Sequence, residues 1–181
     1  DTMYGQLMTA NNKVVFSSDA GYDFAYDFSK KYKGQMIEEV SVEFVSTTQK
    51  KNGSATIIDK GNYVNFQDKN HNNIKLTKTG IAMSYKMAQN LNVKQGDFVS
   101  WHIVGDDKWQ KTRIAQIYRD PSVQGIAMKR DVFESLEYDF IPTGVLTNKS
   151  VDKSLTDEEE ISTILNITDM KATFSKTMEM M

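Results

Sequence analysis

Hydrophobic and polar positions alternate along much of the chain before Pro121, which is typical of strands with one buried face. From Val40 to Phe44 every second residue is hydrophobic and the two residues between are polar. The segments 50–53, 59–62 and 105–108 have the composition of turns between such strands. The pattern predicts strands over residues 13–16, 40–48, 55–58, 63–66, 98–104, 111–118, 125–128 and 142–148.

Other segments carry apolar residues at helical spacing. Thr79 can cap a helix in which positions 81, 85, 88 and 91 form one apolar stripe. Asp19 and the lysines near residue 31 suit the two ends of another helix, although the aromatic residues between them alternate as in a strand. The predicted helices cover residues 19–32, 79–91, 130–136, 156–165 and 169 onward.

The predictions of the last two helices are based on capping residues and on helical periodicity. Thr156 to Glu159 form a capping box, followed by apolar residues at 161, 164 and 165. Met170, Phe174 and Met178 then recur every four residues. We expect these three side chains to attach the terminal helix to the body of the domain.

Composition restricts the class of protein. The 181 residues are 39% hydrophobic and carry 22 Lys and Arg against 24 Asp and Glu, a formal charge of −2. Neither sign dominates, which argues against a nucleic-acid partner. No apolar run exceeds three residues, whereas a transmembrane helix needs about 20. Cysteine is absent, so disulfides, thiolate metal sites and cysteine nucleophiles are excluded.

Familiar catalytic signatures are missing: the sequence has no phosphate-binding loop, no nucleophile elbow and no His-Glu-x-x-His motif. His71 and His102 are the two histidines, and each could in principle be a base or a ligand, but neither has an identifiable partner. The carboxylates at 106–107 and 158–160 lack the spacing of a calcium loop and fit a turn and a helix start. We therefore predict no catalytic residue, no cofactor and no metal site.

One aromatic cluster has two interpretations. Tyr22, Phe24, Tyr26 and Phe28 lie close together in the sequence. They could form an exposed platform for a peptide or glycan, because tyrosine combines apolar area with a polar tip. They could instead form an aromatic edge of the core, and this interpretation is favoured because large exposed apolar patches are uncommon.

The segment Gly-Ile-Ala-Met-Ser-Tyr-Lys-Met-Ala-Gln-Asn-Leu-Asn-Val-Lys-Gln-Gly-Asp at 80–97 resembles a segment of FtsX-like, MacB-type ABC transporter permeases. The strands and helix that follow, up to Leu136, continue the resemblance. So does 164–178, which is similar to the stretch that these permeases place before their second transmembrane helix. The positions that match the family motif are Ser84, Met87, Ala88, Leu91, Gly96 and Asp97.

The resemblance implies an α+β fold, with a porter-like α/β layer made from both chain ends and an inserted β-rich subdomain. The layer would comprise residues 1–50 and 140–181, and the insertion residues 51–139. It also implies an extracytoplasmic domain carried between two membrane helices, so that the intact protein is tethered to the cell membrane. The partner would be an ABC ATP-binding subunit.

The resemblance thus favours a non-catalytic domain that binds cargo or a partner and transmits ATP-driven motion. A peptide, a lipoprotein or a cell-wall protein would be the bound species, in export or in antimicrobial-peptide resistance. Met170, Phe174 and Met178 would form the coupling helix. Two alternatives stay open: a free-standing surface-binding protein or adhesin that uses the aromatic cluster, and a secreted hydrolase that uses His102.

Overall fold

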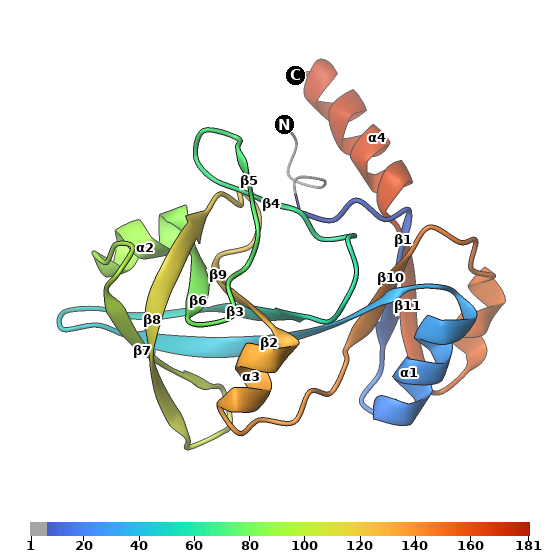
Figure 1. Ribbon diagram of the computed structural model, residues 1–181. Helices are drawn as coiled ribbons and strands as arrows, with labels where there is room; N and C mark the ends of the chain where they lie inside the picture. Colours follow the sequence, from blue (N-terminus) through green and yellow to red (C-terminus); the bar gives the residue numbers. More distant parts are fainter. Residues whose placement is uncertain (1–6) are drawn as a thin grey trace. The chain divides into compact units, whose positions relative to one another are not determined.

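The computed structural model describes residues 7–181, which form a mixed α and β fold with more strand than helix (Figure 1). These residues divide into two compact units. Unit 1 contains the described residues up to Glu38, together with Asp59–Asn65 and Ile141–Met181. Unit 2 contains Glu39–Ile58 and Phe66–Phe140.

Unit 1 is built around an antiparallel sheet in the order β11, β1, β10 and β2. Its strands are β1 (Asn12–Phe16), the start of β2 (Gln35–Val45), β10 (Gly144–Thr147) and β11 (Ile161–Asn166). Side chains of β1 alternate between buried and half-buried positions, as its sequence pattern predicts. The main buried apolar residues of the unit are Val14, Phe16, Ala25, Phe28, Met36, Ile37, Val145, Leu146, Ile164 and Ile167.

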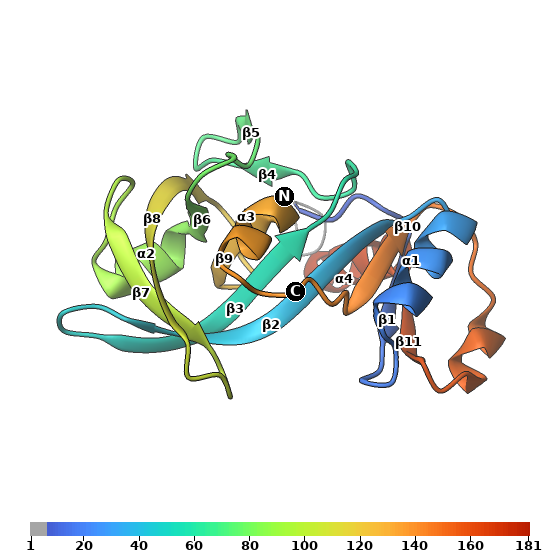
Figure 2. The same ribbon diagram turned by 60° about the horizontal axis from the view of Figure 1, so that its bottom comes forward.

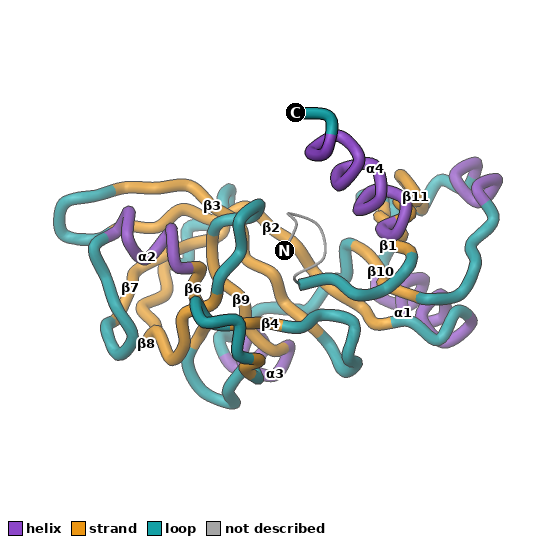
Figure 3. The backbone as a smooth tube through the Cα atoms, turned by 90° about the horizontal axis from the view of Figure 1, so that it is seen from above, coloured by secondary structure: helices purple, strands orange, loops and turns teal. Residues whose placement is uncertain are grey.

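Helices of unit 1 flank this sheet. The helix α1 (Tyr22–Lys31) packs near β10 and buries Ala25 and Phe28. The 3-10 helix η1 (Lys153–Asp157) precedes β11, and α4 (Ile167–Glu179) follows it. Beyond its first turns α4 extends away from β1, β10 and β11 (Figure 3).

Unit 2 is a closed barrel of six strands. Neighbouring strands follow the order β2, β3 (Lys50–Ile58), β9 (Gly125–Lys129), β6 (Ile81–Ser84), β8 (Trp109–Tyr118) and β7 (Phe98–Ile103). The ring closes because β7 also pairs antiparallel with β2 (Figure 2). The pairs β3–β9 and β6–β8 are parallel. Large side chains that are almost fully buried include Phe44, Ile57, Met83, Trp101, Ile114, Ile126 and Met128.

Short elements complete unit 2. The helix α2 (Tyr85–Leu91) follows β6, and α3 (Arg130–Ser135) follows β9. The strands β4 (Phe66–Gln67) and β5 (Asn73–Ile74) form a separate antiparallel pair.

Two segments of the barrel repeat each other, which the sequence analysis missed. Gly80–Leu91 and Gly125–Leu136 share Gly-Ile-Ala-Met at their first four positions and leucine at the twelfth. Each segment forms a strand and then a helix. The two strands pair antiparallel with Ala82 opposite Ala127, the third residue of each copy, so an approximate twofold axis passes through this pair. The residue after each copy has a positive φ: Asn92 and Glu137.

Most predicted strands are confirmed, but one predicted strand and one predicted turn are wrong. In the predicted strand 63–66 only Phe66 belongs to a strand, β4. Val64 makes an isolated bridge with Met8. The predicted turn at 50–53 is the beginning of β3, and the chain instead reverses at 46–49, where Ser46 N–H donates to the carbonyl of Gln49 at 2.9 Å. Residues 50–53 have the composition of a turn, but their place in the sheet outweighs this local preference.

The predicted helix 79–91 is wrong over residues 79–84, nearly half of its length. Ile81–Ser84 form β6, the strand between β8 and β9, and all four residues are buried. A fully buried strand carries apolar residues at every position and so mimics the start of an apolar helical stripe. The helix begins only at Tyr85.

The predicted helix 156–165 is also wrong. The chain forms η1 and then β11, which pairs with the edge of β1. Ile161 and Ile164 are buried in this sheet. Pairing with β1 therefore makes this segment a strand, although its apolar residues also fit a helical period. The helix over 19–32 is confirmed as α1, although its N-cap is Gly21 and not Asp19.

The expected insertion began at residue 51, whereas unit 2 begins at Glu39. The second half of β2 lies in unit 2 because its residues 42–45 pair with Ser100–Ile103 of β7.

Candidate functional site

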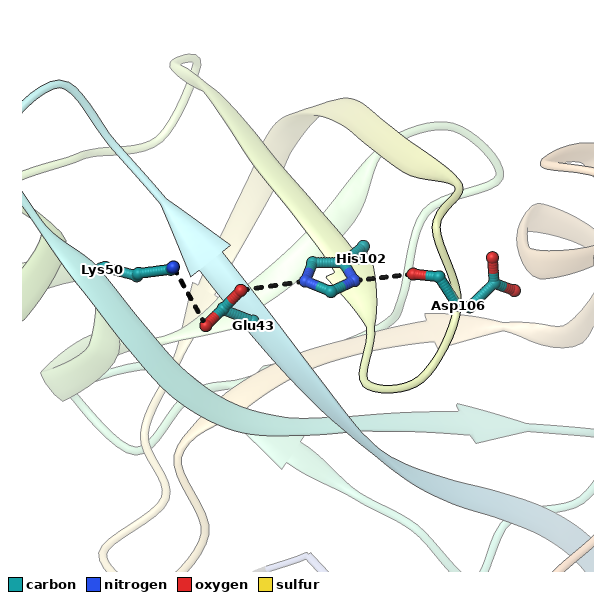
Figure 4. A network of polar contacts seen from close by, with 4 residues as sticks. All are labelled: Glu43, Lys50, His102 and Asp106. Atoms are coloured by element: carbon teal, nitrogen blue, oxygen red, sulfur yellow. Dashed lines mark hydrogen bonds and ion pairs between the residues drawn. The ribbon is translucent and has the colours of Figure 1, made fainter.

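His102 lies at the seam where the barrel of unit 2 closes. It is on β7, directly opposite Glu43 on β2. Its Nε2 is 2.9 Å from Oε1 of Glu43, and its Nδ1 is 2.8 Å from the carbonyl oxygen of Asp106 (Figure 4). Lys50 Nζ lies 3.7 Å from the other oxygen of Glu43. A short polar chain therefore runs across the seam.

The surroundings of His102 favour its protonated form. Each ring nitrogen lies within hydrogen-bond distance of an oxygen acceptor, and an imidazolium can donate to both of them at once. The hydrogen bond to Glu43, and then the one to the Asp106 carbonyl, raises the pKa of His102 above its ordinary value. The same bond to His102, helped by Lys50, lowers the pKa of the Glu43 carboxyl.

Both histidines have partners within the protein. Both ring nitrogens of His102 already have oxygen partners within the protein, and its ring lies 4.2 Å from that of Trp109, so the arrangement offers no open nitrogen to a substrate. His71 is elsewhere in unit 2, where its Nε2 accepts from Arg119 Nη1 at 2.9 Å. Within residues 7–181 no group of three or more His, Asp or Glu is placed to hold a metal ion.

The aromatic cluster of α1 is divided between two environments. Phe24 and Phe28 meet the ring of Phe16 edge-on, with centroids 5.6 and 5.7 Å away. Tyr22 and Tyr26 stack on each other at 6.0 Å, and Tyr26 is 42% exposed. The four residues therefore do not form one surface: the phenylalanines contact the core, and the tyrosines line the outer side of the helix.

A groove of about 210 Å³ lies beside α1 in unit 1. Small-molecule pockets commonly have about 300–1,000 Å³, so this groove suits one side chain of a larger partner better than a whole ligand. Phe28 and Tyr32 stack at 4.5 Å within it. Its lining residues are Phe24, Asp27, Phe28, Lys31, Tyr32, Leu155 and Glu158.

The residues of the family motif lie in and around α2 and in the turn before β7. Met87, Ala88 and Leu91 are the buried face of α2. Ser84 is fully buried, and its Oγ accepts from the N–H of Gly125 at 3.0 Å, which links the two repeated segments. Gly96 and Asp97 belong to the turn before β7: Gly96 has a φ of +97°, and Asp97 Oδ2 accepts from Lys94 N–H at 3.0 Å. These six residues therefore position α2 and β7.

The expectation for the terminal helix needs correction. Met170 and Phe174 are half-buried, but Met178 is 52% exposed. Among the described residues, α4 contacts β1 and β11 and then extends away from them, so Met178 lies beyond the part of the helix that meets the sheet (Figure 3). Met178 does not attach the helix to unit 1.

Two buried polar residues of β2 were missed by the sequence analysis. Gln35, 1% exposed, donates to the carbonyl of Asp59 at 2.8 Å and accepts from Tyr63 N–H at 2.9 Å. Glu38 is 7% exposed and accepts from Ile141 N–H at 2.9 Å. Burial raises the pKa of Glu38 to about 7. No sequence signal marks either residue, because the alternating pattern becomes clear only from Val40.

Comparisons with known proteins give no family assignment: no protein-family model matches the sequence, and no curated protein matches it. None of the helices in residues 7–181 is both long and apolar enough to cross a membrane.

Proposed function

We propose that this chain is the extracytoplasmic domain of an ABC transporter permease subunit, carried between two membrane helices. The observation that carries the proposal is the meeting of Asn11 and Ile167 in unit 1. Ile167 N–H donates to the carbonyl of Asn11 at 2.7 Å, and the Thr168 hydroxyl donates to its Oδ1 at 3.0 Å. The segments that lead into β1 and out of β11 thus lie side by side, as in a domain joined to two neighbouring membrane helices.

In this proposal unit 1 is the porter-like α/β layer, since it is made from both ends of the chain, and unit 2 is the β-rich insertion. ATP hydrolysis takes place in a separate or fused ATP-binding subunit, and the domain itself is non-catalytic. Its own partner is a peptide, a lipoprotein or a cell-wall protein, and it contacts no nucleic acid.

The helix α4 is the element that transmits motion. Its start is fixed by Asn166, whose Oδ1 accepts from Asp169 N–H at 2.7 Å and caps the helix. The half-buried Met170 and Phe174 are the proposed attachment of its first half to unit 1, and its second half extends away from the sheet (Figure 3). Tilting of an attached membrane helix would therefore act on unit 1 as a rigid-body movement, which needs packing and no reactive side chain.

The groove beside α1 is the proposed contact for cargo. Phe28 and Tyr32 offer an aromatic wall, and the two carboxylates of Asp27 and Glu158 outnumber the one cation in the lining, Lys31. This combination suits a peptide side chain with an apolar stem and a positive end. The groove also favours a second candidate function, a free-standing surface-binding protein that uses the same contact.

Isolation of the intact protein from cells tests the proposal against this second candidate. We expect the protein to stay in the membrane fraction until detergent is added, and to copurify with an ATP-binding subunit that hydrolyses ATP. Release by a salt wash without detergent, with peptide binding retained, would favour the free-standing protein. Absence of any associated ATP-binding protein would contradict the permease assignment.

Substitution in α4 tests the transmission step in the intact transporter. Phe174→Asp should abolish transport while the complex still assembles and hydrolyses ATP, because it breaks the attachment of α4 to unit 1. Ala172→Asp places the same charge on an exposed position of the helix and should leave transport unchanged. Equal transport by wild type and Phe174→Asp would refute the coupling role of α4.

A further inference from the structure

The outer face of the β7–β8 hairpin in unit 2 carries aromatic rings and cations at paired positions. Register places Phe98 opposite Arg113, Ser100 opposite Lys111, and His102 opposite Trp109. The residues between them on β7, Val99 and Trp101, are buried in the barrel. The six paired side chains therefore share the outer face, with the two aromatic residues at diagonal corners.

This face is exposed and locally positive. Phe98 is 57% exposed and Trp109 is 48% exposed. Lys111 and Arg113 are exposed beside them. His102 adds a third basic side chain, a cation when it is protonated, and Glu43 on β2 is the carboxylate paired with it. The whole chain has a formal charge of −2, so these cations form a face of opposite sign to the chain as a whole.

We propose that this face, named here the β7–β8 face and formed by Phe98, Ser100, His102, Trp109, Lys111 and Arg113, docks on a phospholipid bilayer that contains anionic headgroups. Lys and Arg side chains near an anionic bilayer each contribute about 1 kcal/mol of attraction. Tryptophan and phenylalanine gain by placing their rings at the headgroup level. The combination of exposed rings with cations on one face matches both contributions.

Two other occupants fit the face less well. Phe98 and Trp109 are separated by four residues along the strands and one strand spacing, which puts their Cα atoms about 14 Å apart. That is about four times the 3.4 Å per nucleotide of a stacked strand, so the two rings cannot stack on successive bases. A second copy of the chain, docked symmetrically on the same face, would bring Lys111 and Arg113 against their own counterparts.

Cosedimentation of the 181-residue chain with vesicles tests the proposal directly. We expect binding to phosphatidylcholine vesicles that contain phosphatidylglycerol, and much weaker binding to pure phosphatidylcholine. The double variant Lys111→Glu, Arg113→Glu should lower the partition coefficient at least about twenty-fold, since each cation accounts for about a fivefold change. Raising the ionic strength from about 0.1 to 1 M should have a similar effect, because screening shortens from about 10 to 3 Å.

A matched double variant controls for net charge. Lys30→Glu, Lys69→Glu makes the same change at two exposed lysines that are not on β2, β7 or β8, and it should bind like wild type. If both double variants lost vesicle binding equally, the effect would be one of general charge and the proposal would be overturned. If neither variant lost vesicle binding, the proposal would be overturned as well.

The aromatic contribution has its own measurement. Trp109 is exposed and Trp101 is fully buried, so vesicle binding should shift the tryptophan emission to the blue in wild type but not in Trp109→Phe. Preference for a single-stranded oligonucleotide over the vesicles, or a dimer that Phe98→Glu disrupts, would assign the face to another occupant. These results concern the isolated chain, so they are independent of whether the intact protein is a permease.

Discussion

Replacing Glu38 by glutamine is expected to stabilise unit 1 at neutral and alkaline pH and to have little effect at acid pH. The carboxyl is 7% exposed and accepts one hydrogen bond, from Ile141 N–H at 2.9 Å. Glutamine keeps an oxygen for that bond but has no charge to bury. Burial disfavours the ionised form, and for this reason the pKa of Glu38 rises from its ordinary value of 4.5 to about 7.

The sign and size of the effect follow from proton linkage. The folded chain binds the Glu38 proton more tightly than the unfolded chain, so the stability from this proton is fully present below pH 4.5 and is lost as pH rises through about 7. Each pH unit between these two values corresponds to 1.36 kcal/mol, which makes the loss roughly 3 kcal/mol by pH 8. Glu38→Gln should recover most of this amount.

Urea unfolding followed by circular dichroism, at several pH values from 4 to 8, measures the effect. Hydrogen exchange of the β10 amides, for example Val145, assigns it to unit 1, whereas tryptophan fluorescence reports unit 2, which contains Trp101 and Trp109. Glu159→Gln removes one charge from an exposed position of unit 1 and controls for net charge. A Glu38→Gln protein whose stability still falls as steeply as that of wild type between pH 5 and 8 would refute the reasoning.

Three further predictions concern other contacts. In an NMR titration Glu43→Gln should lower the pKa of His102 toward its ordinary value, because the carboxylate that favours the imidazolium is gone; an unchanged pKa would contradict the assigned bond. Gly125→Ala should destabilise unit 2 by about 3 kcal/mol or more in urea unfolding, since its Cβ would overlap the carbonyl oxygen of Ser54 at a φ of +154°, whereas Gly21→Ala, with open space around it, should be tolerated. Gln35→Leu should cost about 1–3 kcal/mol for each of the two backbone groups that it leaves unpaired, and a stability within error of wild type would argue against their burial.

Local pattern was sufficient where a strand has one buried face or a helix has clear ends. The alternation at Val40–Phe44 and the acidic-to-basic gradient of residues 19–32 both predicted the right element. It failed where an element is buried on all sides or is chosen by a distant partner. Ile81–Ser84 could be told from a helix only by the strands on both sides of it, and Ile161–Asn166 became a strand because β1 offered a free edge.

The repeat in the barrel could have been found in the sequence, because Gly-Ile-Ala-Met occurs at 80–83 and again at 125–128. Comparison of the chain with itself at a separation of 45 residues would have shown it. Its meaning needed the structure, since only the register places Ala82 opposite Ala127 and relates the two copies by a twofold axis.

By itself the sequence determined that the chain has a sheet-rich core, no thiol chemistry and no apolar segment of transmembrane length. These properties depend on composition and on short-range periodicity, which are present in the chain before it folds. Tertiary structure decided the rest. The chain carries a net charge of −2, yet pairing of β7 with β8 brings the cations Lys111 and Arg113 to one face with two exposed aromatic rings. Likewise, only pairing of β2 with β7 opposes Glu43 to His102, and only burial gives Glu38 its raised pKa. Such features depend on register and burial, and these are properties of strands that are distant in sequence and become neighbours only in the folded chain.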